Sequence, residues 1–280
     1  MASLKEQAIT QGVFKSFSVV GADARTYLHS QLTCDLLGEF DYSKGLLLEP
    51  DGKLIDILHL FPIEGGIEVV ASSQSIEEVA NRLRRFLLRT KATVGEIADV
   101  SLYLDGDLEL AISPQSGEDL PLDEGELLAL RLINGDVARG HDYQEALFPN
   151  ALIDIDRYVS FTKGCYVGQE YVERTHSRGA TAPKNLGLFA STSAVKGPIL
   201  QGESEVGATL VGMDLLAVDM RDELKSALKE KFGSYDYLFF GIYSRKLQAA
   251  HSSDVAIQDE VKPLTAANES GELIEVYRLS

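Results

Sequence analysis

A proline-aspartate-glycine turn between two apolar runs constrains the fold of this chain more than any other local feature. The run LLLE ends at Glu49, Pro50-Asp51-Gly52 follows, and LIDILHLF begins at Leu54. Proline presets φ and glycine tolerates positive φ, so the two runs are predicted to pair as a β-hairpin. A third strand, GIEVVAS at 66–72, follows without an intervening helix. This order favours an antiparallel α+β arrangement over a doubly wound parallel sheet.

Two amphipathic helices flank these strands. Apolar residues at helical spacing predict one helix over 23–37, with Asp23 as its cap. A second helix follows Ser75 and Glu78, which have the S-x-x-E spacing of a capping box. Its later turns are rich in arginine, which is typical of a solvated face that complements the helix dipole. Further strands near 91–97 and 100–106 complete a unit consistent with a ferredoxin-like layer.

The last hundred residues predict a β-rich unit with one helix. Four runs have strand character, and they are NLGLFAS, GATLVGMD, YDYLFFGIYS and LIEVYRL. A helix is predicted over 219–233, with Asp219 as its cap. The polar stretch 248–271 is predicted to be a loose loop.

Length and charge limit the classes of function. A chain of 280 residues predicts two or three domains rather than one. With 43 acidic against 26 basic side chains the net charge is −17, which would repel a phosphate backbone, so we expect no direct nucleic-acid partner. No stretch resembles a signal peptide or a membrane span, and we expect a cytoplasmic protein, or a mitochondrial matrix protein if the source is eukaryotic.

The two cysteines, Cys34 and Cys165, make several kinds of site improbable. In a reducing compartment a disulfide between them is not expected. They cannot supply four thiolates for an iron–sulfur cluster or a closed zinc site, and the chain has no CxxC, HExxH, P-loop or GxGxxG motif. We therefore predict no metal site.

The segment KGCYVGQE, residues 163–170, places a thiol between two glycines. Glycine permits close approach of a ligand, and a neighbouring lysine favours the reactive thiolate form of cysteine. From these residues alone, a buried cysteine in a glycine-rich turn before a helix remains an alternative interpretation.

The amino-acid sequence KGCYVGQE resembles the signature of the GcvT-like folate-binding proteins of the YgfZ branch, which are relatives of the glycine-cleavage aminomethyltransferase. Three other blocks resemble the same family in order and spacing over residues ~10–185. They are GADARTYLHSQLTCDL, EPDGKLIDILHLF and RLINGDVARGHD, and the signature itself extends to FPNALIDIDRYVSFTKGCYVGQEYVERTHSRG.

The resemblance implies an α+β fold built as an aminomethyltransferase-like three-part ring. Two intertwined α+β units, one of them ferredoxin-like at about 45–125, would occupy residues 1–185. A C-terminal β-barrel-like domain would occupy 186–280, remodelled around the predicted helix. Tetrahydrofolate, or a one-carbon derivative, would bind in the central opening, with the Cys165 loop at its border.

The implied function is that of an accessory protein in the assembly or repair of iron–sulfur enzymes, including radical enzymes that modify tRNA. The implied partners are folate and iron–sulfur client enzymes or assembly proteins, and we expect a monomer without a membrane partner. The resemblance does not favour aminomethyltransferase activity, because that activity belongs to the relatives that lack the signature cysteine.

Carried over residue by residue, the resemblance implies two groups of site residues. The catalytic group is Cys165, Lys163 and Asp56, and the folate-binding group is Arg131, Asn134, Gln169, Glu170, Arg174 and Arg178. Asp56 falls where the aminomethyltransferases carry an aspartate that faces folate. Asn134 stands where they carry a glutamate that holds the pterin, and an amide lacks the charge-assisted bond. Arg174, Arg178 and Lys163 would form a positive region for the folate tail.

Two other functions remain open at this point. A folate-dependent one-carbon transferase or demethylase would use Asp56 as its acid–base group. A scaffold that has lost its ligand is the third hypothesis, for which Asn134 is the main argument. If Cys165 is the working thiol, we expect it to react with alkylating agents faster than Cys34.

Overall fold

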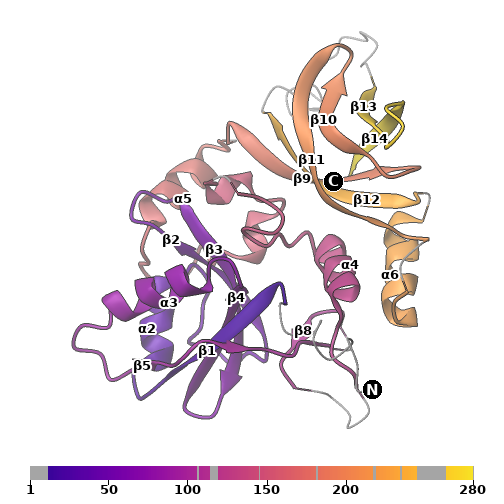
Figure 1. Cartoon of the computed structure of the whole chain (residues 1–280). Helices are drawn as coiled ribbons and strands as arrows, with labels where there is room; N and C mark the ends of the chain where they lie inside the picture. Colours follow the sequence, from indigo (N-terminus) through magenta and orange to yellow (C-terminus); the bar gives the residue numbers. More distant parts are fainter. Residues whose placement is uncertain are drawn as a thin grey trace. The chain divides into compact units, whose positions relative to one another are not determined.

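The computed structural model describes residues 12–105, 107–113, 119–144, 146–180, 182–216, 219–233, 235–244 and 263–279. The chain divides into two compact units (Figure 1). The first comprises Met1–Glu124, Ala138–Pro149 and Asp154–Arg178, and the second comprises Gly125–Val137, Asn150–Ile153 and Gly179–Ser280. Each unit therefore contains segments that are distant in the sequence.

The first unit is an antiparallel sheet with helices. Its elements are β1 (Phe14–Val20), α2 (Ala24–Gln31), β2 (Ser43–Leu48), β3 (Leu54–Ile63), β4 (Gly66–Ser72), α3 (Ile76–Arg85), β5 (Thr93–Val94), β6 (Ala98–Asp99), β7 (Tyr103–Leu104), β8 (Leu110–Ala111), a 3₁₀ helix (Ile155–Arg157) and α5 (Gln169–Ser177). Within the described residues the main sheet has the order β2-β3-β4-β1-β5, with β6 also paired to β1, while β7 and β8 form a separate pair. The sheet thus takes in β1, which precedes the range 45–125 predicted for the ferredoxin-like part.

The predicted hairpin is confirmed by the pairing of β2 with β3. Leu47 faces Asp56 across the pair, and the intervening turn is closed by hydrogen bonds from the Glu49 N–H to the Lys53 carbonyl (2.9 Å) and from the Gly52 N–H to the Glu49 carbonyl (2.8 Å). Gly52 has a φ of +88°, which a side chain would strain. β3 lies between β2 and β4, and its residues from Leu54 to Phe61 are buried.

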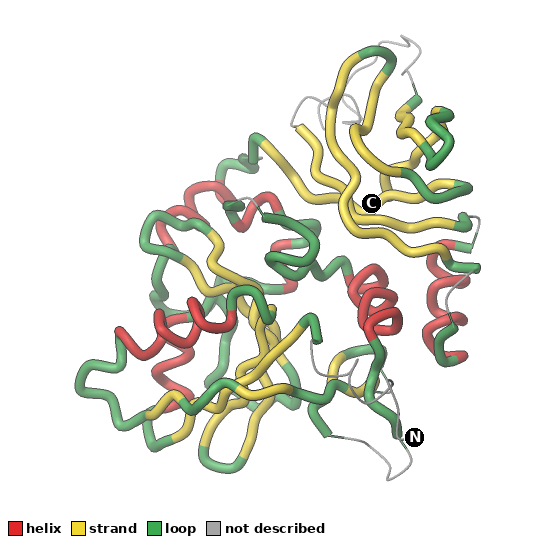
Figure 2. The backbone as a smooth tube through the Cα atoms, viewed as in Figure 1, coloured by secondary structure: helices red, strands yellow, loops and turns green. Residues whose placement is uncertain are grey.

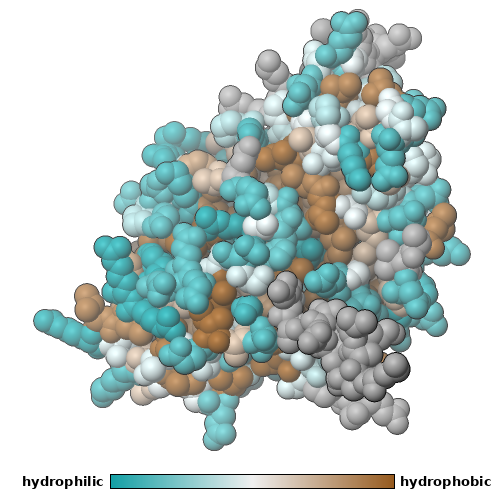
Figure 3. All heavy atoms as spheres, in the orientation of Figure 1, coloured by the Kyte–Doolittle hydropathy of each residue, from teal (hydrophilic) through white to brown (hydrophobic). Residues whose placement is uncertain are grey.

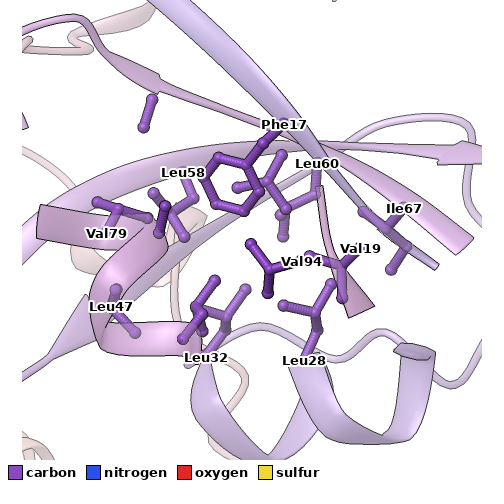
Figure 4. Packing of buried hydrophobic residues seen from close by; sticks show 14 of the residues in the cluster. Phe17, Val19, Leu28, Leu32, Leu47, Leu58, Leu60, Ile67, Val79 and Val94 are labelled. Atoms are coloured by element: carbon purple, nitrogen blue, oxygen red, sulfur yellow. The ribbon is translucent and has the colours of Figure 1, made fainter. Parts of the chain in front are cut away.

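The core of the first unit lies between the sheet and helices α2 and α3. Figure 4 shows Leu28 and Leu32, from α2 and its end, pointing toward Phe17 and Leu58 of the sheet. Val79 of α3 joins the same cluster. The spacing of these side chains confirms the predicted apolar helix faces.

Helix α2 is shorter than the sequence predicted. It ends at Gln31 rather than near residue 37, and its N-cap residue, Asp23, makes no side-chain cap. The Asp23 carboxylate instead accepts a hydrogen bond from the Lys91 N–H (2.8 Å), which ties α2 to the segment before β5.

The second unit contains a closed barrel. Its elements are α4 (Glu124–Asn134), β9 (Lys184–Ser191), β10 (Lys196–Gln201), β11 (Ser204–Asp214), α6 (Asp222–Phe232), β12 (Tyr237–Ser244), β13 (Leu264–Ala267) and β14 (Leu273–Leu279). The first residue of α4, Glu124, still belongs to the first unit, and the 3₁₀ helix Pro149–Ala151 begins in the first unit and ends in the second. Six strands of the described residues close in the order β10-β11-β12-β9-β14-β13. The predicted α+β class with a C-terminal barrel is confirmed.

The loop predicted over 248–271 is wrong in its last part. Leu264–Ala267 forms β13, which pairs with both β10 and β14. Barrel closure leaves each strand with two neighbours, so this strand of four residues is stabilised by main-chain hydrogen bonds on both edges. Residues 248–262 lie outside the described residues.

Helix α6 interrupts the barrel strands between β11 and β12, as Figure 2 shows. Its N-cap is Arg221 without a side-chain cap, so the predicted cap at Asp219 is wrong. The Arg221 guanidinium and N–H instead bind the buried Glu126 of α4, at 2.8 and 2.9 Å. This charge-assisted pairing joins α6 to α4.

The face drawn in Figure 3 mixes hydrophilic and hydrophobic residues. Within the part of the chain that the structure describes, no helix is long and apolar enough to cross a membrane.

Candidate functional site

Asp56 lies in β3 with its carboxylate buried. Its Oδ2 accepts hydrogen bonds from the Ser75 hydroxyl and from the Ser72 N–H (3.1 Å), and its Oδ1 accepts from the Ile57 N–H (2.9 Å). Burial raises the pKa of Asp56 to about 6, while these hydrogen bonds and the charge of Arg139 act in the opposite direction. A carboxyl that titrates near neutral pH can both accept and release a proton under physiological conditions.

The capping box predicted at the start of α3 does not form. Ser75 is the N-cap residue, but its side chain makes no cap hydrogen bond and donates to Asp56 instead. Glu78 accepts a hydrogen bond from Arg139 (2.9 Å). A buried carboxylate without donors would be costly, so the tertiary bonds replace the local cap.

A segment of the RLINGDVARGHD block packs beside Asp56. Arg139 donates to the carbonyl of Ile55 (2.7 Å), the residue before Asp56. Tyr143, just after the block, is buried, and its hydroxyl has no hydrogen-bond partner among the described residues. Burial, and then the negative charge of Asp56, raise the pKa of Tyr143. Asp56, Ser75, Arg139 and Tyr143 are called the Asp56 cluster below.

The signature cysteine lies on the surface. Residues 160–168, called the Cys165 loop below, connect a short 3₁₀ helix to α5, and the Cys165 thiol is exposed. Cys34 is buried, and both cysteines are free, as the sequence predicted. Burial raises the pKa of Cys34 to about 11. The two thiols therefore occupy opposite environments.

The two glycines beside Cys165 differ in their surroundings. Gly168 has a φ of +82°, and a Cβ there would lie 2.9 Å from the carbonyl oxygen of Glu49. A Cβ at Gly164 would meet no heavy atom within 4 Å. Gly168 is therefore required by the turn and by packing, whereas the space around Gly164 is open.

The Lys163 ammonium binds main-chain carbonyls rather than the Cys165 thiol. Its Nζ donates to the carbonyls of His29 (2.5 Å), Leu32 (2.6 Å) and Cys34 (2.8 Å), at the end of α2. Burial lowers the pKa of Lys163 to about 8. The prediction that its charge acts on Cys165 thus gains no support from the geometry.

Helix α5 follows the Cys165 loop and carries Gln169, Glu170 and Arg174, and Arg178 is its C-cap residue. Gln169 is half-buried, and the exposed ones are Glu170, Arg174 and Arg178. The Arg174 guanidinium lies 5.8 Å from the ring centre of Tyr171. His176, on the same helix, stacks on Phe161 with ring centres 3.8 Å apart.

The hairpin turn packs on α5. A Cβ at Gly52 would lie 2.4 Å from the Cβ of Tyr171. The Tyr171 ring also stacks on Phe148, with ring centres 4.4 Å apart. Two blocks that the resemblance singled out, the hairpin turn and the signature, are therefore in contact.

Arg131 and Asn134 lie in the second unit. Arg131 is buried on α4, and Asn134 is the last residue of that helix. The preceding carbonyl, of Ile133, accepts a hydrogen bond from Lys231 of α6 (2.5 Å). The proposed pterin contacts of Arg131 and Asn134 stay a prediction.

Comparison with known proteins shows what the chain is similar to. No family model matches it. It is 26% identical over 260 residues to the tRNA-modifying protein YgfZ of Hamiltonella defensa, covering 73% of this chain and 76% of that protein. It is 26% identical over 204 residues to the protein of the same name from Aliivibrio fischeri strain MJ11, covering 58% of this chain and 64% of that protein.

A solved structure agrees in fold. The crystal structure of glycine cleavage system aminomethyltransferase T from Bartonella henselae matches 99% of this chain and 88% of that chain, with a TM-score of 0.59 and 14% identity. In sequence the chain is similar to the YgfZ proteins, and in fold it is similar to the GcvT aminomethyltransferase.

The predicted site residues form three groups. The Cys165 loop and α5 with its C-cap residue carry Lys163, Cys165, Gln169, Glu170, Arg174 and Arg178, the sheet of the same unit carries Asp56, and α4 in the second unit carries Arg131 and Asn134. Sequence reasoning missed Tyr143 and the roles of Ser75 and Arg139. The available signal was that Arg139 lies inside the RLINGDVARGHD block and Tyr143 directly follows it.

Other kinds of site are not evident in the described residues. They contain no group of three or more His, Cys, Asp or Glu residues that could hold a metal ion. A cavity of about 330 Å³ lies in the second unit beside α6, where Leu215, Met220 and Leu228 are among its lining residues. None of the predicted site residues lines it.

Proposed function

We propose that this chain is a tetrahydrofolate-binding accessory protein for the assembly or repair of iron–sulfur enzymes, including enzymes that modify tRNA, with Cys165 as its working thiol. Its likeness to proteins named tRNA-modifying protein YgfZ and its aminomethyltransferase-like fold support this proposal. The proposed partners are iron–sulfur client enzymes, and the net charge of −17 argues against direct binding of tRNA. Two free cysteines are consistent with a reducing compartment such as the cytoplasm.

The observation that carries the proposal is the exposure of Cys165 in an anchored loop. Free cysteine is one of the most frequently buried residue types, and Cys34 follows that rule. Cys165 does not, although Lys163 and Gly168 on either side of it are fixed by the rest of the first unit. An accessible thiol of this kind can attack a disulfide of an oxidised client, which forms a mixed disulfide and releases the client's other cysteine as a thiol.

The Asp56 cluster supports the folate part of the proposal. A pterin ring presents both donors and acceptors, and it needs buried polar partners. Asp56 and the unpartnered hydroxyl of Tyr143 are such groups, and they lie within electrostatic reach of each other. The exposed Arg174 and Arg178 could pair with the anionic glutamate tail of a folate. Tetrahydrofolate, when bound, would supply a carrier for a one-carbon unit.

A second function is favoured by the pKa of Asp56. At about 6 it suits a general acid–base group, as a one-carbon transferase or demethylase would require. The two proposals differ in the residue on which activity depends. The first depends on the Cys165 thiol, and the second depends on the Asp56 carboxyl.

Calorimetric titration of the full chain with tetrahydrofolate tests the shared part of both proposals. We expect saturable binding by the wild type and by Cys165→Ala. The absence of binding heat, together with no shift in melting temperature, would identify a scaffold without its ligand.

Tests in cells separate the two functions. In cells that lack the chain, we expect Cys165→Ala to leave a nucleoside made by a radical iron–sulfur enzyme unmodified, measured by mass spectrometry of tRNA. Cys34→Ala, the matched control, should restore the modification. Restoration by Cys165→Ala together with failure of Asp56→Asn would favour the transferase.

A further inference from the structure

The ammonium of Lys163 has no N–H left for another acceptor. A protonated lysine has three donors, and those of Lys163 meet three carbonyl oxygens, of His29, Leu32 and Cys34, at 2.5 to 2.8 Å. A thiolate or a folate carboxylate could bind this ammonium only by displacing one of these carbonyls.

These three carbonyls lie at or just beyond the end of α2: His29 is in its last turn, Leu32 is its C-cap residue, and Cys34 follows two residues later. Helix α2 ends at Gln31, and the last carbonyls of a helix have no partner within it. A cation at a helix C-terminus also interacts favourably with the helix dipole. Lys163 therefore completes the end of α2 from a position more than a hundred residues later in the sequence.

A second set of hydrogen bonds fastens the same two segments. Thr33 donates from its hydroxyl to the Tyr158 carbonyl (2.6 Å) and accepts at its own carbonyl from the Ser160 N–H (2.9 Å). Its hydroxyl also accepts from the Leu46 N–H of β2 (2.8 Å). The chain before Cys165 is thus attached to the end of α2 at both Thr33 and Lys163.

The other side of the Cys165 loop is also held. Tyr166 is buried, with its ring centre 5.2 Å from the Lys163 ammonium, and Gly168 packs against the main chain of Glu49. The exposed Cys165 therefore lies between two fixed points. These attachments fix the two ends of the segment that carries the thiol.

We propose that Lys163 is a positioning residue, whose ammonium clamps the Cys165 loop to the end of α2 and acts neither on the thiol's ionisation nor as a folate ligand. The proposal rests on the proposed function in one respect: that function assigns a role to the thiol that the loop positions. It replaces the roles that the family resemblance implied for Lys163. At pH 7 the ammonium is the main form, because its pKa of about 8 lies above that pH.

Three variants test the clamp in the full chain. Lys163→Met removes all three donors, Lys163→Arg keeps a cation with several donors, and Lys163→Gln keeps two N–H donors without charge. Lys91→Met, at an exposed side chain of the same unit, is the matched control.

Hydrogen–deuterium exchange gives the first readout. We expect Lys163→Met to speed exchange in peptides covering 29–34 and 160–168 by about tenfold or more, with Lys163→Arg closer to wild type and Lys91→Met unchanged. Unchanged exchange in Lys163→Met would overturn the proposal. If that variant does not fold, Lys163→Gln must show intermediate exchange confined to these two segments.

The pH dependence of iodoacetamide labelling at Cys165 gives the second readout. A clamp predicts that the pH of half-maximal labelling rate is the same in wild type and Lys163→Met. A shift upward by about one pH unit would show that Lys163 activates the thiol, and would contradict the proposal. Neither readout uses folate or a client protein. A result that contradicts the clamp therefore leaves the proposed function untouched, and a failure of the proposed function leaves the clamp untouched.

Discussion

The Asp56 cluster and the Cys165 loop belong to the same unit of the chain, yet they hold their reactive groups in opposite ways. Asp56 is buried, and every donor to its carboxylate comes from the surrounding main chain or from Ser75. Cys165 is exposed, and the hydrogen bonds go to its neighbours rather than to the thiol. Burial changes the proton affinity of the acid, whereas anchoring sets the position of the thiol.

This difference has a consequence for mutation. Substitutions in the Asp56 cluster should change stability in a pH-dependent way, because a buried charge is involved. Substitution of Gly168, which anchors the Cys165 loop by packing and backbone conformation, should lower stability at every pH, because packing and backbone strain do not titrate.

The largest expected effect is that of Gly168→Ala. Gly168 has a φ of +82°, and the added Cβ would lie 2.9 Å from the Glu49 carbonyl oxygen, so we predict a loss of about 3 kcal/mol in the free energy of unfolding. Gly164→Ala, four residues earlier in the same loop, should cost less than about 1 kcal/mol, because its added Cβ would meet no heavy atom within 4 Å. Urea unfolding measures both, and equal losses would show that the two ends of the loop are not held differently.

Asp56→Asn should change the pH dependence of stability. The folded-state pKa of Asp56 is raised from 3.8 to about 6, so the folded chain binds the proton more tightly than the unfolded chain. The contribution of Asp56 to the free energy of unfolding is therefore full below pH 4 and falls as the pH rises to 6, by at most about 3 kcal/mol.

The measurement is the difference in stability between wild type and Asp56→Asn at pH 4 and at pH 7. Comparing the two proteins cancels the titration of the other acidic groups. A wild-type advantage that is the same at both pH values would show that Asp56 titrates as an ordinary exposed aspartate.

Ser75→Ala should have a smaller effect. It removes one donor from the buried carboxylate, and we expect a loss of about 1 to 2 kcal/mol and a further rise in the pKa of Asp56. Ser73→Ala removes a hydroxyl whose contact with His141 is exposed, and it should stay within about 0.5 kcal/mol of wild type. Carboxyl NMR titration follows the pKa, and a fall in Ser75→Ala would contradict the assigned hydrogen bond.

Much of the fold could be predicted because its signals are local. The Pro50-Asp51-Gly52 turn determines the hairpin through the backbone preferences of proline and glycine. The apolar faces of α2 and α3 follow from residue spacing. Strand β13 could not be predicted in this way, since it is stabilised by its barrel neighbours rather than by its composition.

The predicted site residues rest on the family resemblance and stay a prediction, while the structure shows contacts of these residues and their neighbours that the local sequence pattern does not predict. Ser75 and Glu78 have the spacing of a capping box, but the Ser75 hydroxyl donates to the buried Asp56 and the Glu78 carboxylate accepts from Arg139. Lys163 lies two residues from Cys165 in the sequence, yet it binds the end of α2. In both cases a long-range partner outcompetes the local one, and a single sequence contains no sign of such a partner.

The central claim, that Cys165 is a presented and working thiol while Cys34 is structural, is tested most directly by the labelling rates of the two cysteines. Folded protein is treated with iodoacetamide, and each cysteine is followed by mass spectrometry, with and without tetrahydrofolate. We predict that Cys165 is labelled at least about tenfold faster than Cys34 and that tetrahydrofolate slows its labelling. Equally slow labelling of both cysteines would contradict the account.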